Sequence, residues 1–262
     1  MPLTTLLSPD TAPLTTLRLE RLQLTRDAVY QLIVTGGREV VVYPLVGGLT
    51  VRRAGEVWHL PGRAHVRQAP PALLRIPGGV EFELGCYLDY TEWLAADVLL
   101  LSTDATPAAW APLPLVQRPE HRWTHAVGEG THARQVTEWV TPPGWTLHVG
   151  ETLNPPGAWS SWPAHATPAE AETRYADHEE VFWVVTPGTG LLSLDGWYAT
   201  GERALELREV ANSAACVVPL GSHPIVFTPD AWGGYWWGYR SGVLQKTYNR
   251  FADECGVQTY VK

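Results

Sequence analysis

Short apolar runs separated by turn signals make up most of the N-terminal half of the chain. Each run alternates in polarity or is apolar over only a few residues, with many Val, Ile, Leu and Thr positions, a pattern typical of β-strands. We predict strands at Val29–Thr35, Glu39–Tyr43, Leu49–Arg53, Val57–Leu60, Ala72–Ile76 and Val80–Leu84. Gly-Gly, Ala-Gly and Pro-Gly pairs lie between them and predict turns. Regularly spaced short strands of this kind indicate a β-sandwich or β-barrel.

The C-terminal half repeats this layout. Strands are predicted at Thr146–Glu151, Val181–Thr186, Gly190–Leu194, Trp197–Thr200, Cys216–Pro219, Ile225–Thr228 and Gly234–Tyr239. The pair Asp195-Gly196, set between alternating residues, predicts a two-residue hairpin turn. Two short helices are expected, near Thr91–Leu99 and Ala204–Glu209. The predicted fold class is therefore all-β.

A constant offset relates the two halves. Gly190 follows Gly48 by 142 positions (190 minus 48), and Pro219 follows Pro77 by the same interval (219 minus 77). Only two copies of such a unit fit in 262 residues, so we predict a duplicated β-unit rather than a solenoid. The expected organisation is an N-terminal barrel (1–111), a connection (112–134) and a C-terminal barrel (135–262) in tandem.

Composition excludes several classes of protein. The 22 Pro and 24 Gly favour turns over long helices, and a hydrophobic fraction of 45% is too high for a disordered chain. The net charge of −8, with no run of Lys or Arg, leaves no basic surface for nucleic acid. The three cysteines form no Cys-x-x-Cys pair, so neither a disulfide framework nor a zinc ribbon is indicated. Without a signal-peptide or membrane-spanning pattern, we expect a soluble cytoplasmic protein with no membrane partner; a homo-oligomer is left open.

The stretch Gly157–Trp183 concentrates the candidate chemistry, because it contains His165, His178, Glu179 and Glu180. Glu180 begins an apolar strand, in which the period of two directs Glu180, Phe182 and Val184 to one face. His223 follows a predicted turn later in the chain. Imidazole and carboxylate groups suit Zn, Fe, Mn, Ni or Co. Taken singly, His165 and His223 also fit roles in turns, and Glu179 and Glu180 fit a solvated pair.

Four motifs stand out in this half of the chain: T-H-A-R-Q-V (131–136), V-G-E-T-L-N-P-P-G-A-W-S-S-W-P-A-H (149–165), E-E-V-F-W (179–183) and V-V-P-L-G-S-H-P (217–224). With them the chain resembles a known family, the bicupin 5-deoxy-glucuronate isomerases of inositol catabolism, which are related to the 4-deoxy-threo-hexosulose-uronate ketol-isomerases. The resemblance implies two tandem cupin barrels of the double-stranded β-helix or jelly-roll type. It also implies a divalent metal, such as Zn, Mn, Fe or Ni, bound by His165, Glu180 and His223.

One departure from the family pattern affects the metal site. The family has H-K-H-D where this chain has His165-Ala166-Thr167-Pro168, so Thr167 replaces the second histidine. Either His178, two residues before Glu180, supplies the missing nitrogen, or the site is reduced to three ligands or holds no metal. The sequence offset places Gln23, Arg38 and Glu81 opposite His165, Glu180 and His223, so the N-terminal barrel is expected to lack the ligands.

The resemblance implies an enzyme, an aldose–ketose isomerase that acts on a deoxy uronic acid. Glu179 and His178 are candidate proton shuttles for the reaction. Trp162 is a candidate sugar contact, and one of Arg174, Arg240 and Lys246 is expected to pair with the substrate carboxylate. The alternatives are an isomerase for a related uronate, or a catalytically inactive cupin that binds a sugar acid. Thr167 favours the inactive protein, as do Leu220 and Ser222 where the family has Arg and Tyr.

Five further histidines are interpreted as surface residues. His121, His125 and His132 lie in the predicted connection at irregular spacing, and His59 and His65 lie in the N-terminal half. Among the 13 Trp residues, those clustered in the C-terminal half are expected mainly to pack in the core or at the barrel rim. These residues therefore add no second candidate site.

Overall fold

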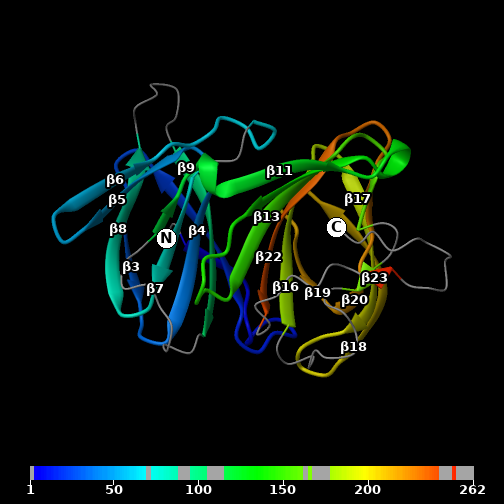
Figure 1. Ribbon diagram of the computed structural model, residues 1–262, viewed down its shortest axis with the longest axis horizontal. Coiled ribbons are helices and arrows are strands. Elements are labelled where there is room, and N and C mark those ends of the chain that lie inside the picture. The colour runs from blue at the N-terminus through cyan, green and yellow to red at the C-terminus, as the bar shows by residue number, and fades with distance from the viewer. Residues whose placement is uncertain are drawn as a thin grey trace. The chain divides into compact units, whose positions relative to one another are not determined.

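The computed structural model describes residues 3–68, 72–87, 95–104, 115–161, 165–166, 178–241 and 250–251. Its regular structure is almost entirely β-strand, with short 3₁₀ turns at Pro119–His121 and Gly130–His132. The chain forms two compact units, each shown in Figure 1. Unit 1 comprises Met1–Ser8, Thr16–Trp123 and Trp139–Leu147, and unit 2 comprises Pro9–Thr15, Thr124–Glu138 and His148–Lys262. Each unit therefore includes a short segment taken from outside its main stretch of sequence.

Two antiparallel sheets build unit 1. The larger has the order β1 (Leu3–Leu7), β2 (Arg18–Thr25), β9 (Ala95–Asp104), β4 (Arg38–Val46), β7 (Leu73–Pro77) and β10 (Leu115–Gln117). The smaller has the order β3 (Val29–Val34), β8 (Val80–Tyr87), β5 (Gly48–Arg53) and β6 (Glu56–Leu60). Alternate residues of both sheets form one apolar core that includes Leu24, Val42, Val51, Phe82 and Leu100.

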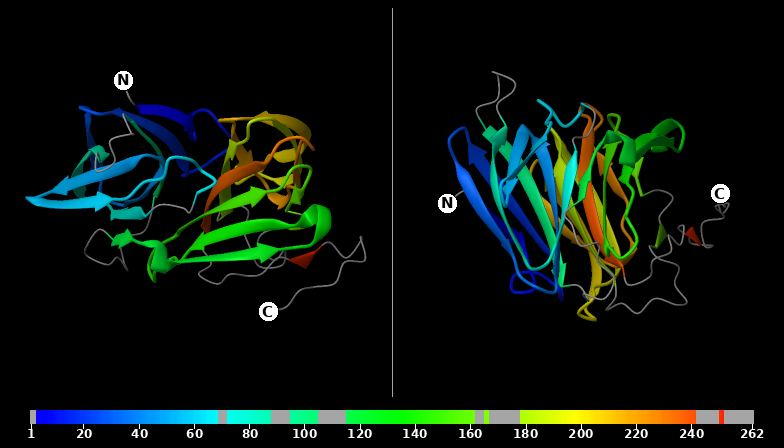
Figure 2. Two further views of the ribbon diagram at one scale, coloured as in Figure 1. Left: turned by 90° about the horizontal axis from the view of Figure 1, so that it is seen from above. Right: turned by 60° about the vertical axis from the view of Figure 1, so that its left-hand side comes forward.

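Unit 2 is built in the same way. Its larger sheet has the order β11 (Arg122–Val127), β12 (Arg134–Trp139), β13 (Leu147–Asn154), β22 (Gly233–Ser241), β16 (His178–Val185) and β19 (Ala215–Val218). Its smaller sheet has the order β14 (Trp159–Ser160), β21 (Ile225–Phe227), β17 (Thr189–Trp197) and β18 (Arg203–Ala211), and β20 (Leu220–Ser222) also pairs with β17. A separate two-stranded sheet joins β15 (His165–Ala166) to β23 (Arg250–Phe251). Figure 2 shows β11 and β12 side by side.

The duplication predicted from the 142-residue offset is present in the strand order. The order β9-β4-β7 of unit 1 corresponds to β22-β16-β19 of unit 2, and β8-β5-β6 corresponds to β21-β17-β18. Gly48 and Gly190 occupy equivalent strands, β5 and β17. The prediction of two β-units with the same layout is therefore confirmed.

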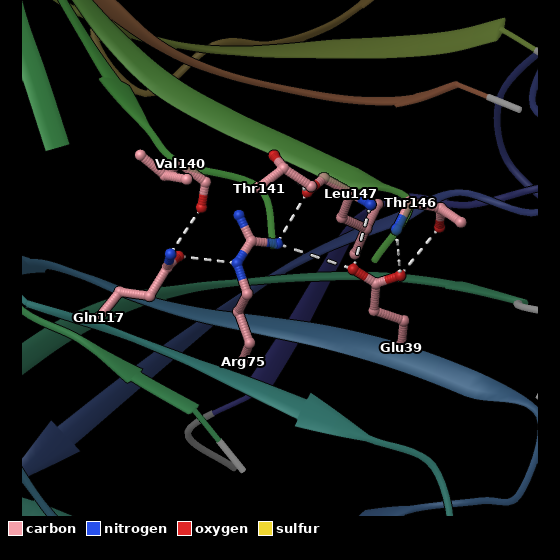
Figure 3. Close-up of polar contacts among 7 residues, drawn as sticks. All are labelled: Glu39, Arg75, Gln117, Val140, Thr141, Thr146 and Leu147. Atoms are coloured by element: carbon pink, nitrogen blue, oxygen red, sulfur yellow. Dashed lines mark hydrogen bonds and ion pairs between the residues drawn. The ribbon is translucent and has the colours of Figure 1, made fainter. Parts of the chain in front are cut away.

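A buried polar cluster in unit 1 attaches the segment Trp139–Leu147 to the larger sheet (Figure 3). The Glu39 carboxylate accepts hydrogen bonds from the backbone N–H groups of Thr146 (2.9 Å) and Leu147 (3.0 Å). The Arg75 guanidinium donates to Gln117 and to the carbonyl of Leu147, both at 2.7 Å. The Glu39 and Arg75 side chains are fully buried, and the Oε1 atom of Glu39 lies 3.7 Å from the Nη1 atom of Arg75. Because a buried carboxylate needs donors, this segment is part of the unit rather than a loose connection.

Burial shifts the pKa values of Arg75 and Glu39 in opposite directions. It lowers the pKa of Arg75 to about 10, although the Glu39 carboxylate acts to raise it. It also raises the pKa of Glu39, against the effect of the hydrogen bonds that this carboxylate accepts. Each charged form is therefore less favourable than in water, and the hydrogen bonds of the cluster offset part of that cost.

The hairpin predicted at Asp195-Gly196 is wrong. β17 runs through both residues to Trp197, and the turn lies after it, so the strand predicted at Trp197–Thr200 is also wrong. At this point β17 pairs closely with β20: a Cβ on Gly196 would lie 2.3 Å from the carbonyl oxygen of Leu220. Gly196 therefore permits a close backbone approach instead of a turn.

Both predicted helices are also wrong where the structure describes them. Ala95–Leu99 lies in β9, and Ala204–Glu209 lies in β18, which pairs with β17 over its full length. Residues 91–94 lie outside the described part of the chain. In β18, Ala204 and Val210 face the core whereas Leu205 and Leu207 are exposed. Strand pairing therefore overrides the helix propensity of these residues.

Candidate functional site

The first residues of β16 bring a histidine and a glutamate to the same face of a strand. Side chains alternate along a strand, so His178, Glu180, Phe182 and Val184 share one face. Phe182 and Val184 belong to the apolar core of unit 2, which identifies this face as the barrel interior. The strand begins at His178, far enough back to include this histidine.

His178 and Glu180 are both buried, at 2% and 7% exposure. The Nε2 atom of His178 lies 3.7 Å from the Oε2 atom of Glu180, longer than a hydrogen bond. Within the described residues, neither ring nitrogen of His178 has a hydrogen-bond partner. The pair therefore presents ionisable groups to the barrel interior with unused hydrogen-bonding capacity on the imidazole.

His223 joins this end of the interior from the smaller sheet. It lies between β20 and β21, is 3% exposed, and its ring packs edge-on against Phe182 at 5.8 Å. Its Nδ1 atom is 3.0 Å from the carbonyl oxygen of Gly221. Burial lowers the pKa of His223 below its ordinary value of 6.5, while the nearby Glu180 carboxylate acts to raise it. His223 is therefore close enough to Glu180 to be influenced by its charge.

The remaining predicted metal ligand, His165, is described only through its backbone. It lies in β15 and pairs with Phe251 of β23, and β15 lies beside β20, the strand that leads to His223. Trp162, Thr167, Arg174 and Lys246 lie outside the described residues. Their predicted roles are tested only by experiment.

The structure places Glu179 and Arg240 away from the interior cluster. They are register partners on β16 and β22, and each lies one residue from an interior position, so both point to the opposite face of the sheet. The Glu179 carboxylate accepts a hydrogen bond from the backbone N–H of Thr15, in the segment Pro9–Thr15 of the same unit. We therefore leave both residues out of the candidate site.

The sequence reasoning missed an aromatic and imidazole wall beside Glu180. Tyr239 is the β22 partner of Glu180; its ring stacks on His148 of β13 at 4.6 Å and lies 5.7 Å from the ring of His178. Burial, together with the negative charges of Glu180 and Glu138, raises the pKa of Tyr239 well above its usual 10.0. Its phenol therefore stays protonated at neutral pH. The alternation of Tyr235, Trp237 and Tyr239 in the sequence was the signal that could have predicted this aromatic wall.

The donor set fits a divalent metal in chemistry, because it combines two imidazoles with a carboxylate in a buried setting. No three His, Cys, Asp or Glu side chains converge closely enough to hold a metal by themselves among the described side chains, which do not include that of His165. A metal site here therefore requires a donor outside the described side chains, and His165 is the residue predicted to supply it.

Comparison with known proteins decides the family. Residues 2–240 match the KduI/IolB family, which covers most of the chain. The chain belongs to the KduI/IolB family. Members of this family are isomerases that act on uronates or related sugar acids, so the resemblance carried by the four sequence motifs is confirmed. No curated protein matches the chain by sequence.

Solved structures show the fold of this KduI/IolB chain. An IolB-like protein from Salmonella typhimurium LT2 is 19% identical with a TM-score of 0.79, over 96% of this chain and 92% of that one. The oxalate decarboxylase of Lactobacillus farciminis is 10% identical with a TM-score of 0.64, over 97% and 84%. That of Bacillus subtilis is 10% identical with a TM-score of 0.60, over 92% and 72%. The bicupin fold is thus confirmed.

Within the described residues, every helix is too short and too polar to cross a membrane.

The histidines interpreted as surface residues divide into two groups: His59, His65 and His121 are exposed, whereas His125 and His132 are half-buried.

Proposed function

We propose that unit 2 is a metal-dependent aldose–ketose isomerase for a deoxy uronic acid, with 5-deoxy-glucuronate as the expected substrate. The observation that supports it is the buried group of His178, Glu180 and His223 on the interior face of the C-terminal barrel of a KduI/IolB family member. A structural neighbour, the oxalate decarboxylase of Bacillus subtilis, contains Mn(II) centres, which supports a divalent metal here. A cytoplasmic location and a sugar acid as partner remain predictions from the sequence.

The proposed reaction moves a proton between adjacent carbons of the sugar, and His178, on the interior face of β16, is the candidate group that takes up and returns this proton. A bound divalent metal would polarise the neighbouring carbonyl and hydroxyl oxygens of the substrate. His165, Glu180 and His223 would hold it, and the interior position keeps bulk water away from the reacting carbons. The protonated phenol of Tyr239, beside Glu180, can donate a hydrogen bond to a substrate oxygen. Glu179 contributes no proton transfer in this scheme because it faces the other side of β16.

The carboxylate of the substrate requires a cationic side chain as its partner. Arg240 faces away from the barrel interior, by its register opposite Glu179. Arg174 and Lys246 therefore remain the predicted partners. An arginine gives two parallel hydrogen bonds to a carboxylate, which favours Arg174.

The direct test measures metal content and isomerisation in the same preparations. We expect the purified protein to carry a divalent metal by elemental analysis and to convert 5-deoxy-glucuronate to its 2-keto isomer, followed by nuclear magnetic resonance. His223→Ala should lose the metal and reduce kcat/KM by at least about 100-fold, since a ligand and its charge stabilisation are lost together. His59→Ala, on an exposed strand of unit 1, should leave both quantities unchanged. Wild-type protein that neither carries nor binds a divalent metal would refute the proposal.

A catalytically inactive cupin that binds a sugar acid is the second candidate. Thr167, at the position of the second family histidine, favours it, as does the absence of three converging donors among the described side chains. The two candidates differ in turnover. Saturable binding of glucuronate by calorimetry, with no isomerisation and no exchange of substrate carbon-bound hydrogen with deuterated solvent, would support the second candidate.

A further inference from the structure

Arg134, the first residue of β12, lies on the interior face of the larger sheet of unit 2. Further along the same strand, Glu138 is the register partner of Gly150 on β13, and directly opposed residues share a face of a sheet. A Cβ at Gly150 would lie 2.2 Å from the ring of Trp237, which packs against the apolar core. This face is therefore the barrel interior, and the period of two along a strand puts Arg134 on it with Glu138.

Asn154, the last residue of β13, is the neighbour of Arg134 across the strand pair. Gln135 pairs with Leu153, so the next step of this antiparallel register sets Arg134 opposite Asn154. The Cβ atoms of opposed residues lie about 4.5–5.5 Å apart. The guanidinium and the carboxamide are therefore close enough to contact the same ligand.

The side chain of Asn154 is buried without satisfied hydrogen bonds. It is 3% exposed, and neither Oδ1 nor Nδ2 has a hydrogen-bond partner among the described residues. Buried polar atoms nearly always have a partner, because an unsatisfied one has lost its hydration without replacement. Since the carboxamide offers both a donor and an acceptor, the missing partner must both accept and donate.

Arg134 is a half-buried cation that has no counter-ion in the described part of the chain. Its Nη1 atom donates a hydrogen bond to the carbonyl oxygen of His132 at 3.1 Å. Burial lowers the pKa of Arg134, and the group that opposes this shift is the phenol of Tyr235 rather than a carboxylate. A guanidinium has five N–H donors, so most of them are available to an anion.

The position of this pair is compatible with a ligand that also reaches Glu180. The hydroxyl of Tyr235, beside Arg134, is 2.7 Å from the hydroxyl of Ser160, so these two groups satisfy each other. On the same face of β22, Tyr235 precedes Tyr239, the register partner of Glu180, by about 13 Å at 3.3 Å per residue. A six-carbon sugar acid and an extended arginine side chain together span this separation.

We propose that Arg134 and Asn154 form a subsite in the interior of unit 2 that binds the carboxylate of a hydroxy acid. The guanidinium donates two parallel hydrogen bonds to the carboxylate. The Nδ2 atom of Asn154 donates to the same group, and its Oδ1 atom accepts from a ligand hydroxyl. The inference rests on the proposed function for the identity of the ligand, a uronic acid, and it applies equally to the inactive sugar-acid cupin. It adds an arginine that the sequence did not predict, since only the strand register reveals its face.

The test measures dissociation constants by titration calorimetry on the full chain. The ligands are D-glucuronate and D-glucuronamide, in which a neutral amide replaces the carboxylate. Arg134→Gln should weaken glucuronate binding at least about 10-fold, since charge-assisted hydrogen bonds are lost, and should leave glucuronamide binding nearly unchanged. Arg203→Gln is the matched control, because Arg203 forms an exposed ion pair with Asp195 and should affect neither ligand.

Asn154→Leu separates a ligand contact from a structural role. The substitution keeps the side-chain volume and removes two unsatisfied atoms, so the melting temperature without ligand should not fall. Glucuronate affinity should decrease about 3- to 10-fold, the cost of a neutral hydrogen bond. Saturating glucuronate should raise the melting temperature of the wild type more than that of either Asn154→Leu or Arg134→Gln.

The outcomes distinguish the subsite from the isomerase. If the wild type isomerises 5-deoxy-glucuronate, Arg134→Gln should raise KM and leave kcat nearly unchanged; an unchanged KM and equal glucuronate affinities would overturn the subsite while leaving the activity intact. A lower melting temperature with equal losses for both ligands would identify a structural arginine and also overturn it. Wild-type protein that isomerises nothing but loses glucuronate affinity selectively in Arg134→Gln would retain the subsite and refute the isomerase. Absence of glucuronate binding by the wild type would overturn the subsite.

Discussion

At the scale of single residues, the candidate site depends on which face of a strand each side chain occupies. Glu179 and Glu180 are adjacent in sequence, but one accepts a hydrogen bond from Thr15 and the other faces the barrel interior beside His178. The same rule separates Arg240 from Tyr239 on the partner strand. A shift of either strand by one residue would turn the interior side chains to the opposite face of the sheet. The strand register therefore decides which residues belong to the candidate site.

The stability of the metal-free protein should depend on pH through His223. Its pKa in the folded state is lowered, mainly by burial, so the unfolded chain binds this proton more tightly. The stabilisation is therefore complete above the ordinary pKa of 6.5 and is lost as the pH falls from there towards the lower folded value. We expect this group to contribute a slope of up to about 1.4 kcal/mol per pH unit. Denaturant titrations from pH 8 to pH 5 on the wild type and His223→Gln measure it; equal slopes would contradict the prediction.

At the scale of elements, the approach of β17 to β20 positions the turn that carries His223. Gly196 pairs with Gly221, and a Cβ at Gly196 would lie 2.3 Å from the carbonyl oxygen of Leu220. Gly221 itself has a φ of 149°, in the region that favours glycine. Two facing glycines therefore bring β20 close enough to β17 for His223 to project into the interior from the end of that strand.

Gly196→Ala should consequently affect both stability and metal binding. The added methyl group must push β20 away, which should reduce the free energy of unfolding by about 1–3 kcal/mol and weaken Zn²⁺ binding through His223. Gly36→Ala is the control, because no atom lies within 4 Å of a Cβ at Gly36. Urea denaturation and chelator competition report the two effects. Equal stability of the two variants would show that β20 adjusts without cost.

The sequence predicted many strands correctly because alternation and turn residues are local signals. Val29–Thr35, Leu49–Arg53 and Val80–Leu84 correspond closely to β3, β5 and β8. Asp195-Gly196 misled the prediction because the need for glycine there comes from a distant strand, which no local pattern records. The position of Tyr239 beside Glu180 depends on cross-strand register, and the alternation in either strand alone does not reveal it.

At the scale of the whole molecule, the two barrels share a strand order but differ in what their interiors hold. The interior of unit 1 is a continuous apolar core that contains Val42, Leu49 and Phe82, whereas unit 2 places His178, Glu180 and His223 in its interior. The residues that the sequence offset sets opposite the predicted ligands are Gln23, Arg38 and Glu81. Duplication has therefore kept the scaffold in both copies and the candidate chemistry in one.

Metal stoichiometry should reflect this difference. We expect one divalent ion per chain, and not two, because an apolar interior offers no ligand and would impose a large cost on an unpaired charge. Elemental analysis of protein quantified by amino-acid analysis gives the ratio. The double variant His59→Ala/His65→Ala, which removes two exposed histidines of unit 1, should have the same ratio as the wild type. Two ions per chain, falling to one in that variant, would place a second metal in unit 1.

The buried Glu39 of unit 1 imposes an order on synthesis of the chain. Its two backbone donors belong to Thr146 and Leu147, which leave the ribosome long after the strands of that barrel have been made. Until then the carboxylate has no N–H groups to replace water, so it must stay hydrated or protonated. Completion of the first barrel is thus delayed until the second has begun to emerge, and a gene cut after residue 123 should yield a fragment that fails to fold.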